Sequence, residues 1–412
     1  MPLQRLRRVL EANYRVTVES SDRLLAKVNS QVQQRRLELQ AKGSPLPPAK
    51  NATVLGALQG RRPWDIRAID LLHKIGFVTT PGWVNMARLS ASWATRRYFW
   101  AIGEPVGPQP NLRLSEDARR MDFHQKTLLS DEFGIGVAGL LMENFFGAGS
   151  FVDISLALND PAAYQGIQQD GDAQPDYLMW GSEPDSPYYV VECKGTQTSR
   201  AMSHYQMRRG LEQVPSVVLG MGPREVVTVV VATCLLGNST EVLVLDPPPD
   251  KPDDERHSEE ASERVSERTG ERSWRISNAE AFHERTVVAE ESNLLKWAGQ
   301  FRSASARDRR LERTRLEPIQ IPNAPLETKR TDVGVFRGIE QPLFPALGLR
   351  NLKIFTGVEE ELLESLMQDR PREEAIRRHT ELRMRRDRQS QEHLQANVSV
   401  SSTGSCMIVD GL

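Results

Sequence analysis

The sequence has few cysteines, the residues that form the disulfide bonds of secreted proteins and hold structural zinc ions. Its three cysteines, Cys193, Cys234 and Cys406, lie far apart and form no CxxC pair. A disulfide framework and a structural zinc of the ribbon or finger type are therefore excluded. Lysine is also scarce, with 10 Lys against 43 Arg. A lysine beside an acidic residue therefore deserves closer inspection than an arginine would.

Long hydrophobic runs are absent as well. The longest strongly apolar stretch, Val226 to Leu236, is too short to span a bilayer, which takes about 20 residues. No apolar segment typical of a secretory signal follows the first Met. We therefore expect a cytoplasmic protein without a membrane partner.

Several catalytic signatures are missing too. The sequence contains no HExxH, P-loop or GxSxG motif, and its seven histidines show no ligand spacing. These absences argue against a zinc protease, a P-loop ATPase and an acyl-transfer enzyme. Residues 134–139 match GxGxxG, but a dinucleotide fold requires a strand directly before the first glycine. The preceding residues are helical in pattern, so we expect these glycines to let a helix pack closely on a sheet.

Charge is distributed in blocks, although the net charge is only −2. Residues 1–63 carry twelve Lys and Arg against four acids, whereas residues 131–193 carry eleven acids and no Lys or Arg. Such a distribution suggests a polyanion partner. Two further Arg clusters, 302–315 and 370–388, are either solvated helix faces or phosphate contacts.

Hydrophobic periodicity divides the chain into five parts. Between residues 116 and 246 it predicts a helix over 123–146, strands over 151–158, 176–180 and 188–195, a helix over 199–214, and strands over 226–235 and 241–246. This order predicts an α/β fold with a mixed sheet. We expect a basic, helical N-terminal module over 1–115, a charged low-complexity linker or insertion over 247–275, a mainly helical, Arg-rich region over 276–396 and a disordered tail over 397–412.

Three residues in the predicted sheet carry the chemistry. Asp176 opens one strand, and Glu192 and Lys194 lie on one face of the next, because side chains alternate along a strand. A buried Glu and Lys are costly unless they act together. Two carboxylates held side by side suit a hard divalent cation such as Mg²⁺. Cys193 points to the opposite face, as a core thiol. The alternative interpretation is a surface salt bridge at a strand end.

The pattern Pro175-Asp176, fifteen further residues, then Glu192-Cys193-Lys194 resembles the PD-(D/E)XK nuclease superfamily, the restriction-endonuclease-like fold. The resemblance covers about residues 123–246, where the element order also matches the family's helix, three strands, helix and strand. It implies a restriction-endonuclease-like core that cleaves DNA with Mg²⁺ or Mn²⁺. In this chain Asp176 and Glu192 would hold the metal and Lys194 would assist the nucleophile.

The resemblance also points to residues on the two core helices. Many members place an acidic residue on the first helix near the metal, and Glu132 is preferred here over Glu143. Either acid could equally be a solvated helix residue. A polar residue on the helix after the Lys strand is also common, and Gln206 fits, with Arg209 and Gln213 on the same side. Gln206 as an ordinary surface residue stays the alternative.

The predicted function is a metal-dependent endonuclease acting on DNA, in an anti-phage or restriction setting by resemblance. A partner ATPase or helicase, another defence-complex subunit and a homo-oligomer are all compatible with it. The first alternative is a non-catalytic adaptor with a nuclease fold. The second is a structure-specific resolvase or transposase-type nuclease, which the sequence does not separate from a restriction enzyme.

Overall fold

A computed structural model of the 412-residue chain describes residues 2–44, 52–79, 93–154, 174–181, 186–214, 217–218, 226–246, 274–275, 279–310, 322–344, 349–368 and 397–411. The predicted linker, apart from Trp274 and Arg275, and the second Arg cluster lie outside these residues. None of the helices in the described ranges is both long and apolar enough to cross a membrane.

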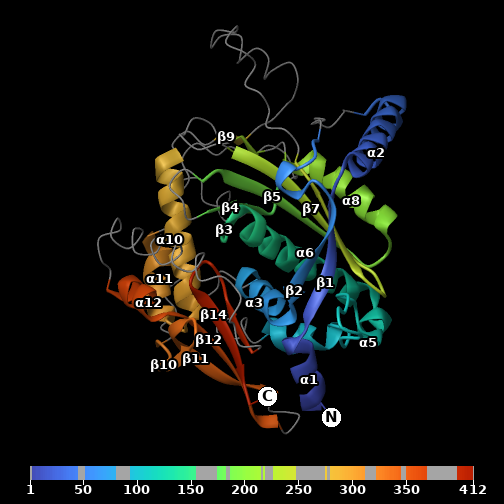
Figure 1. Ribbon diagram of the computed structural model, residues 1–412. Coiled ribbons are helices and arrows are strands. Elements are labelled where there is room, and N and C mark those ends of the chain that lie inside the picture. Colours follow the sequence, from blue (N-terminus) through green and yellow to red (C-terminus); the bar gives the residue numbers. More distant parts are fainter. Residues whose placement is uncertain are drawn as a thin grey trace.

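A seven-stranded mixed sheet forms the centre of the molecule (Figure 1). Its strands, in spatial order, are β2 (Gly60–Arg67), β1 (Asn13–Ser20), β8 (Thr240–Leu245), β7 (Val226–Leu235), β5 (Tyr188–Thr196), β4 (Tyr177–Trp180) and β3 (Ser150–Asp153). Strands β3, β4 and β5 pair antiparallel, whereas β5 and β7 run parallel. The predicted mixed α/β sheet is confirmed. The apolar run of β7 is buried on both faces at the middle of the sheet, as its composition predicts.

Helices cover both faces of this sheet. Helices α6 (Phe123–Phe146) and α3 (Ala68–Val78) lie on one face, and α8 (Arg200–Gln213) and α2 (Asp22–Ala41) lie on the other (Figure 1). The alternation of β7 explains the layering, because Val229 and Val231 join the core beneath α6, while Val230 and Ala232 join the core beneath α8. Both core helices match the expected ranges closely.

The N-terminal residues do not form a separate helical module, which corrects the expectation for residues 1–115. After α1 (Pro2–Glu11), β1 runs parallel to β8 and antiparallel to β2, so both strands extend the central sheet. The residues Tyr14, Val16 and Val18 are buried and alternate with Arg15 and Thr17, a period of two. Residues 60–67 form β2, and helix α3 begins directly after it at Ala68.

The described part of the C-terminal third contains a second, five-stranded sheet beside its helices, which the expectation of a mainly helical region did not include. Its order is β10 (Glu327–Thr331), β11 (Gly334–Phe344), β12 (Leu349–Glu359), β14 (Ser405–Asp410) and β13 (Val398–Val400), and it packs against α10 (Ala279–Trp297) and α12 (Glu360–Met367). Helix α11 (Phe301–Arg310) follows α10. The remaining elements are short: Gly56–Leu58, Phe99–Ala101, α5 (Glu116–Arg120), β6 (Val217–Val218) and β9 (Trp274–Arg275).

The tail expected to be disordered forms the buried hairpin β13–β14. Ser399 and Ser405 hydrogen-bond the two ring nitrogens of His73, at 2.9 and 3.1 Å. The hydroxyl of Ser401 accepts a hydrogen bond from Lys74 at 3.3 Å. These contacts attach the hairpin to α3. A Ser-rich segment is therefore ordered by hydrogen bonds to buried polar groups.

Candidate active site

Asp176, Glu192 and Lys194 converge at the junction of β4 and β5. The antiparallel register pairs Tyr177 with Val191, so the next pair in the ladder places Asp176 opposite Glu192. Side chains of directly opposed residues share one face of a sheet. The Cys193 N–H donates to Asp176 Oδ2 at 2.7 Å, and Lys194 forms an ion pair with Glu192. The ends of the two strands thus bring these side chains into one network.

Glu192 is a fully buried carboxylate beneath α8. Its side chain is 0% exposed, and neither carboxylate oxygen has a hydrogen bond of normal geometry. Burial, then the negative charge of Asp176, raises the pKa of Glu192 from 4.5 to about 8, although Lys194 opposes the rise. Two acids thus share one desolvated position, with one lysine as their counter-charge.

Gly210 allows α8 to pack directly over the Glu192 side chain. A Cβ at Gly210 would lie 2.6 Å from Val230 Cγ1 and 3.2 Å from Glu192 Cγ. Only a residue without a side chain lets the helix approach the sheet this closely. Helix α8 therefore covers Glu192 because position 210 is glycine.

The pKa of Asp176 is also changed by burial and by neighbouring charges. Burial raises its pKa, while Lys194 and the Cys193 N–H lower it, and the nearby Asp153 and Asp131 raise it further. Burial also raises the pKa of Asp131, and Lys194 opposes that rise. Several acids therefore lie near one ammonium group, and their raised pKa values show that the fold favours protons, or another source of positive charge, at this position.

Asp131 is the acid on α6 whose pKa is influenced by Lys194, and the sequence analysis did not identify it. Burial raises the pKa of its neighbour Glu132, and the hydroxyl of Tyr98 and the charge of Arg97 oppose the rise, whereas neither Asp176 nor Lys194 contributes. The glycine at position 195, directly after Lys194, was an indication that α6 packs closely there, because a Cβ at this position would overlap the Ser130 carbonyl oxygen. Close packing at Gly195 brings this turn of α6 against Lys194.

Glu143, the other acid considered on α6, lies in a different network. It forms an ion pair with Lys74 and accepts hydrogen bonds from Ser401 and from the N–H of Ser402. Burial alone would raise the pKa of Glu143, but Lys74 and Ser402 lower it to about 2. Glu143 therefore connects α6 with α3 and the C-terminal hairpin.

Gln206 faces the site from α8. Its Nε2 donates to the Gly195 carbonyl oxygen at 3.1 Å, directly after Lys194, while its Oε1 is buried without a partner among the described residues. Gln213, two turns later, donates to the Gln174 carbonyl oxygen at 3.3 Å. The chain on either side of Asp176 and Lys194 is thereby attached to one side of α8.

The glycines of residues 134–139 are packing residues, as expected. A Cβ at Gly134 would lie 3.1 Å from the backbone of Lys194 and Gly195, where α6 crosses β5. Gly136 and Gly139 instead face Ile75 and Lys74 on α3. Because Gly134 lies within α6 and not after a strand, no dinucleotide-binding turn exists here.

The basic excess of residues 1–63 is partly neutralised within the fold. Arg61 pairs with Glu19 and Glu241, and Arg15 pairs with Asp65. These cations are therefore not all available for phosphate contacts. Removing residues 1–63 would also delete β1 from the sheet, so a truncation does not isolate a DNA contact.

A divalent metal would find two facing carboxylates here. Within the described ranges no group of three or more His, Cys, Asp and Glu residues is arranged to hold a metal ion. Two carboxylates are compatible with Mg²⁺, which keeps several waters and is often held by one or two carboxylates. The buried Glu192 oxygens, which have no normal hydrogen bond, fit such a cation.

Comparisons with known proteins found no match. No protein-family model, no curated protein and no solved structure matches it. The arguments for function therefore come from the residues and their arrangement.

Proposed function

We propose that this protein is a metal-dependent nuclease of the PD-(D/E)XK type that hydrolyses phosphodiester bonds of DNA. The observation that carries the proposal is the convergence of Asp176, Glu192 and Lys194 at the ends of two paired strands. The surrounding order also supports it: α6, three antiparallel strands, α8, and β7 parallel to β5. This is the order that the family resemblance implies for a restriction-endonuclease-like core.

Each residue has a role that follows from its surroundings. Asp176 and Glu192 would hold Mg²⁺ or Mn²⁺ through their carboxylate oxygens. When bound, the metal supplies a more acidic water and neutralises charge on the phosphodiester. Lys194 holds a positive charge beside both carboxylates, where it orients the attacking water or stabilises the charge that develops at phosphorus. Gln206 fixes the main chain after Lys194 and is a positioning residue.

Cleavage assays test the proposal directly. Plasmid, linear and branched DNA are incubated with the full-length protein and Mg²⁺, Mn²⁺ or EDTA. We expect cleavage with either metal, none with EDTA, and none in Asp176→Asn or Lys194→Ala. The exposed residues Glu116 and Lys353 provide matched controls, since Glu116→Gln and Lys353→Ala change the same groups far from the site. Loss of cleavage in both controls, or its persistence in Asp176→Asn, would refute the assignment.

One observation favours the adaptor alternative, namely that the described residues offer no three-ligand metal group. A scaffold has no use for a cation, so metal binding separates the two functions. Calorimetry with Mn²⁺ should show binding to the wild type and a large loss of affinity in Asp176→Asn. A wild type that neither binds Mn²⁺ nor cuts any substrate would be an adaptor. Preference for the branched substrate would indicate a structure-specific resolvase.

A further inference from the structure

We propose that the groove between α2 and α8 binds a single strand of nucleic acid beside the scissile phosphodiester. This inference deepens the proposed function and rests on it, because it names the form of DNA that the nuclease engages. The groove has a volume of about 490 Å³, within the range of sites for small ligands. It can hold a short stretch of unpaired nucleotides and is too small for a duplex.

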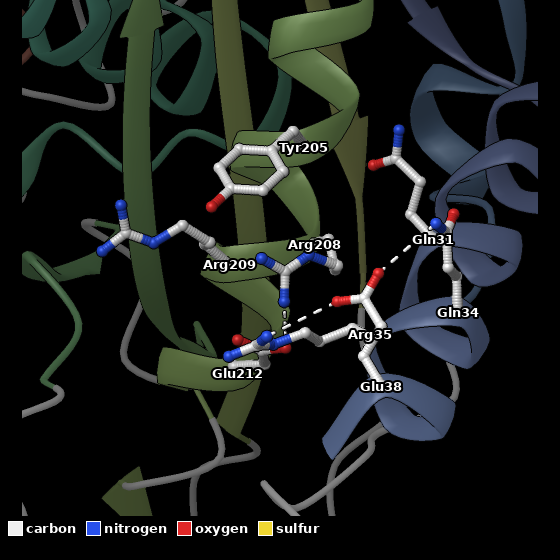
Figure 2. A pocket seen from close by; sticks show the side chains of 8 residues that line it. All are labelled: Gln31, Gln34, Arg35, Glu38, Tyr205, Arg208, Arg209 and Glu212. Carbon is white, nitrogen blue, oxygen red and sulfur yellow. Dashed lines mark hydrogen bonds and ion pairs between the residues drawn. The ribbon is translucent and has the colours of Figure 1, made fainter. Parts of the chain in front are cut away.

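Helix α8 contributes an aromatic ring and two guanidinium groups. Tyr205 is 45% exposed, and Arg208 lies over its ring with the guanidinium carbon 4.8 Å from the centroid. Arg208 is itself held by an ion pair with Glu212. Figure 2 shows Arg208 extending toward Glu212, whereas Arg209 extends away from α2. A tyrosine supported in this way is a stacking platform for a base of any identity.

Helix α2 supplies the opposite wall. Gln31, Gln34, Arg35 and Glu38 extend from α2 toward α8 (Figure 2). Arg35 pairs with Glu38 at 3.5 Å, and Gln31 Oε1 is buried without a partner among the described residues. Neutral amides of this kind can donate hydrogen bonds to base edges and accept hydrogen bonds from them. In a duplex the Watson–Crick edges of the bases are already paired.

Arg209 connects this groove with the catalytic residues. It lies between Gln206 and Gln213 on one side of α8, and these two glutamines hydrogen-bond the main chain next to Lys194 and Asp176. Arg209 is exposed, and no acidic side chain in the described ranges lies within ion-pair distance of it. A strand leaving the site would therefore meet a free cation before it reaches Tyr205.

The charge of the groove favours nucleic acid over an acidic protein. Its lining holds three arginines against two glutamates, so the net charge is +1, and both glutamates are engaged in orienting Arg35 and Arg208. A positive charge combined with an aromatic ring and amides suits a single-strand site, which joins a positively charged groove to side chains on which bases stack.

Binding is measured by fluorescence polarisation with a labelled oligothymidine and a duplex of equal length, in EDTA to prevent cleavage. Tyr205→Leu should weaken single-strand binding about tenfold or more, the loss of one stacked base. Tyr205→Phe keeps the ring and should bind as the wild type does. Arg209→Ala should lower the slope of log affinity against log salt by about 0.7 for the single strand. Arg120→Ala, a change at an exposed arginine on α5, serves as the matched control.

Thermal unfolding confirms that each variant is folded before its binding is compared. Unchanged single-strand binding in folded Tyr205→Leu and Arg209→Ala overturns the groove proposal, even if the wild type cleaves DNA through Lys194. Reduced single-strand binding in a protein that cleaves nothing supports the groove and refutes the nuclease. An equal loss of duplex and single-strand affinity also overturns the groove proposal, because it indicates a general phosphate surface.

Discussion

Replacing Glu192 by Gln should make the metal-free protein more stable at alkaline pH. Glu192 is fully buried beside Asp176, and its pKa rises from 4.5 to about 8. Because the folded-state pKa is the higher one, the stability contribution is complete below pH 4.5 and is lost as pH rises to 8. That difference in pKa corresponds to roughly 5 kcal/mol at pH above 8. Glutamine is uncharged like the protonated acid, so the variant does not lose this stability as pH rises.

The variant also leaves Lys194 without its ion-pair partner. The pKa of about 8 already includes the attraction of Lys194 for the ionised Glu192, so no separate ion-pair loss is subtracted and the gain should be about 4–5 kcal/mol at pH 8.5. The gain should disappear near pH 4.5. Urea unfolding of both proteins in EDTA, across this pH range, measures the difference. Mg²⁺ should stabilise the wild type at pH 8.5 and stabilise Glu192→Gln far less. A variant less stable than the wild type at every pH would refute the reasoning.

Three further predictions concern residues around the site. Burial and Lys74 lower the pKa of His73 from 6.5 to about 3, so only the unfolded protein takes up a proton at this residue as pH falls below 6.5. The free energy of unfolding should therefore fall by about 2 kcal/mol between pH 6.5 and 5. Urea unfolding of the wild type against His73→Gln measures this loss. Gly210→Ala should cost about 1–3 kcal/mol and slow cleavage, because its Cβ would lie 2.6 Å from Val230 Cγ1; an unchanged melting temperature would contradict this packing. Glu143→Gln should destabilise the protein by about 3–5 kcal/mol by leaving Lys74 buried without its ion pair, whereas the double variant Glu143→Leu with Lys74→Met should recover most of the loss in thermal unfolding.

The centre of the fold could be predicted because its patterns are local and strong. Residues 123–146 keep a helical pattern up to Gly147, whose φ of 63° ends α6. The run from Val226 to Leu235 is apolar except for Thr228 and Thr233, as expected for a strand buried on both faces. Asp176 and Glu192 could be brought together from sequence because the strands that carry them are neighbours in the chain as well as in the sheet.

The two ends of the chain were harder, because their partners are distant in sequence. Strand β1 pairs with β8, where Val18 lies opposite Val242. The pairing with β8 and the antiparallel pairing with β2 decide between a strand and a continuation of α1, since Leu10, Tyr14 and Val16 fit either period. The hairpin β13–β14 is rich in serine and is ordered by His73 and Lys74, more than 320 residues away in the chain. Composition does not reveal such pairings.

The choice between acids on α6 depended on the direction of each side chain. Glu132 and Asp131 are adjacent, so they point about 100° apart around the helix. Asp131 responds to Lys194, while Glu132 lies against Tyr98. The helical period alone does not set which of the two directions faces β5. The close contact of Gly195 with Ser130 sets it.

The most direct test of the nuclease assignment is the cleavage rate of one labelled DNA substrate by wild type and Lys194→Ala, both saturated with Mn²⁺. Asp176 and Glu192 remain in the variant, so Mn²⁺ should still bind, as measured by calorimetry on the same samples. The cleavage rate should fall at least about 100-fold, the loss expected when one charge-stabilising group is removed. Equal rates in the two proteins would contradict the proposed role of Lys194 and the assignment of this site.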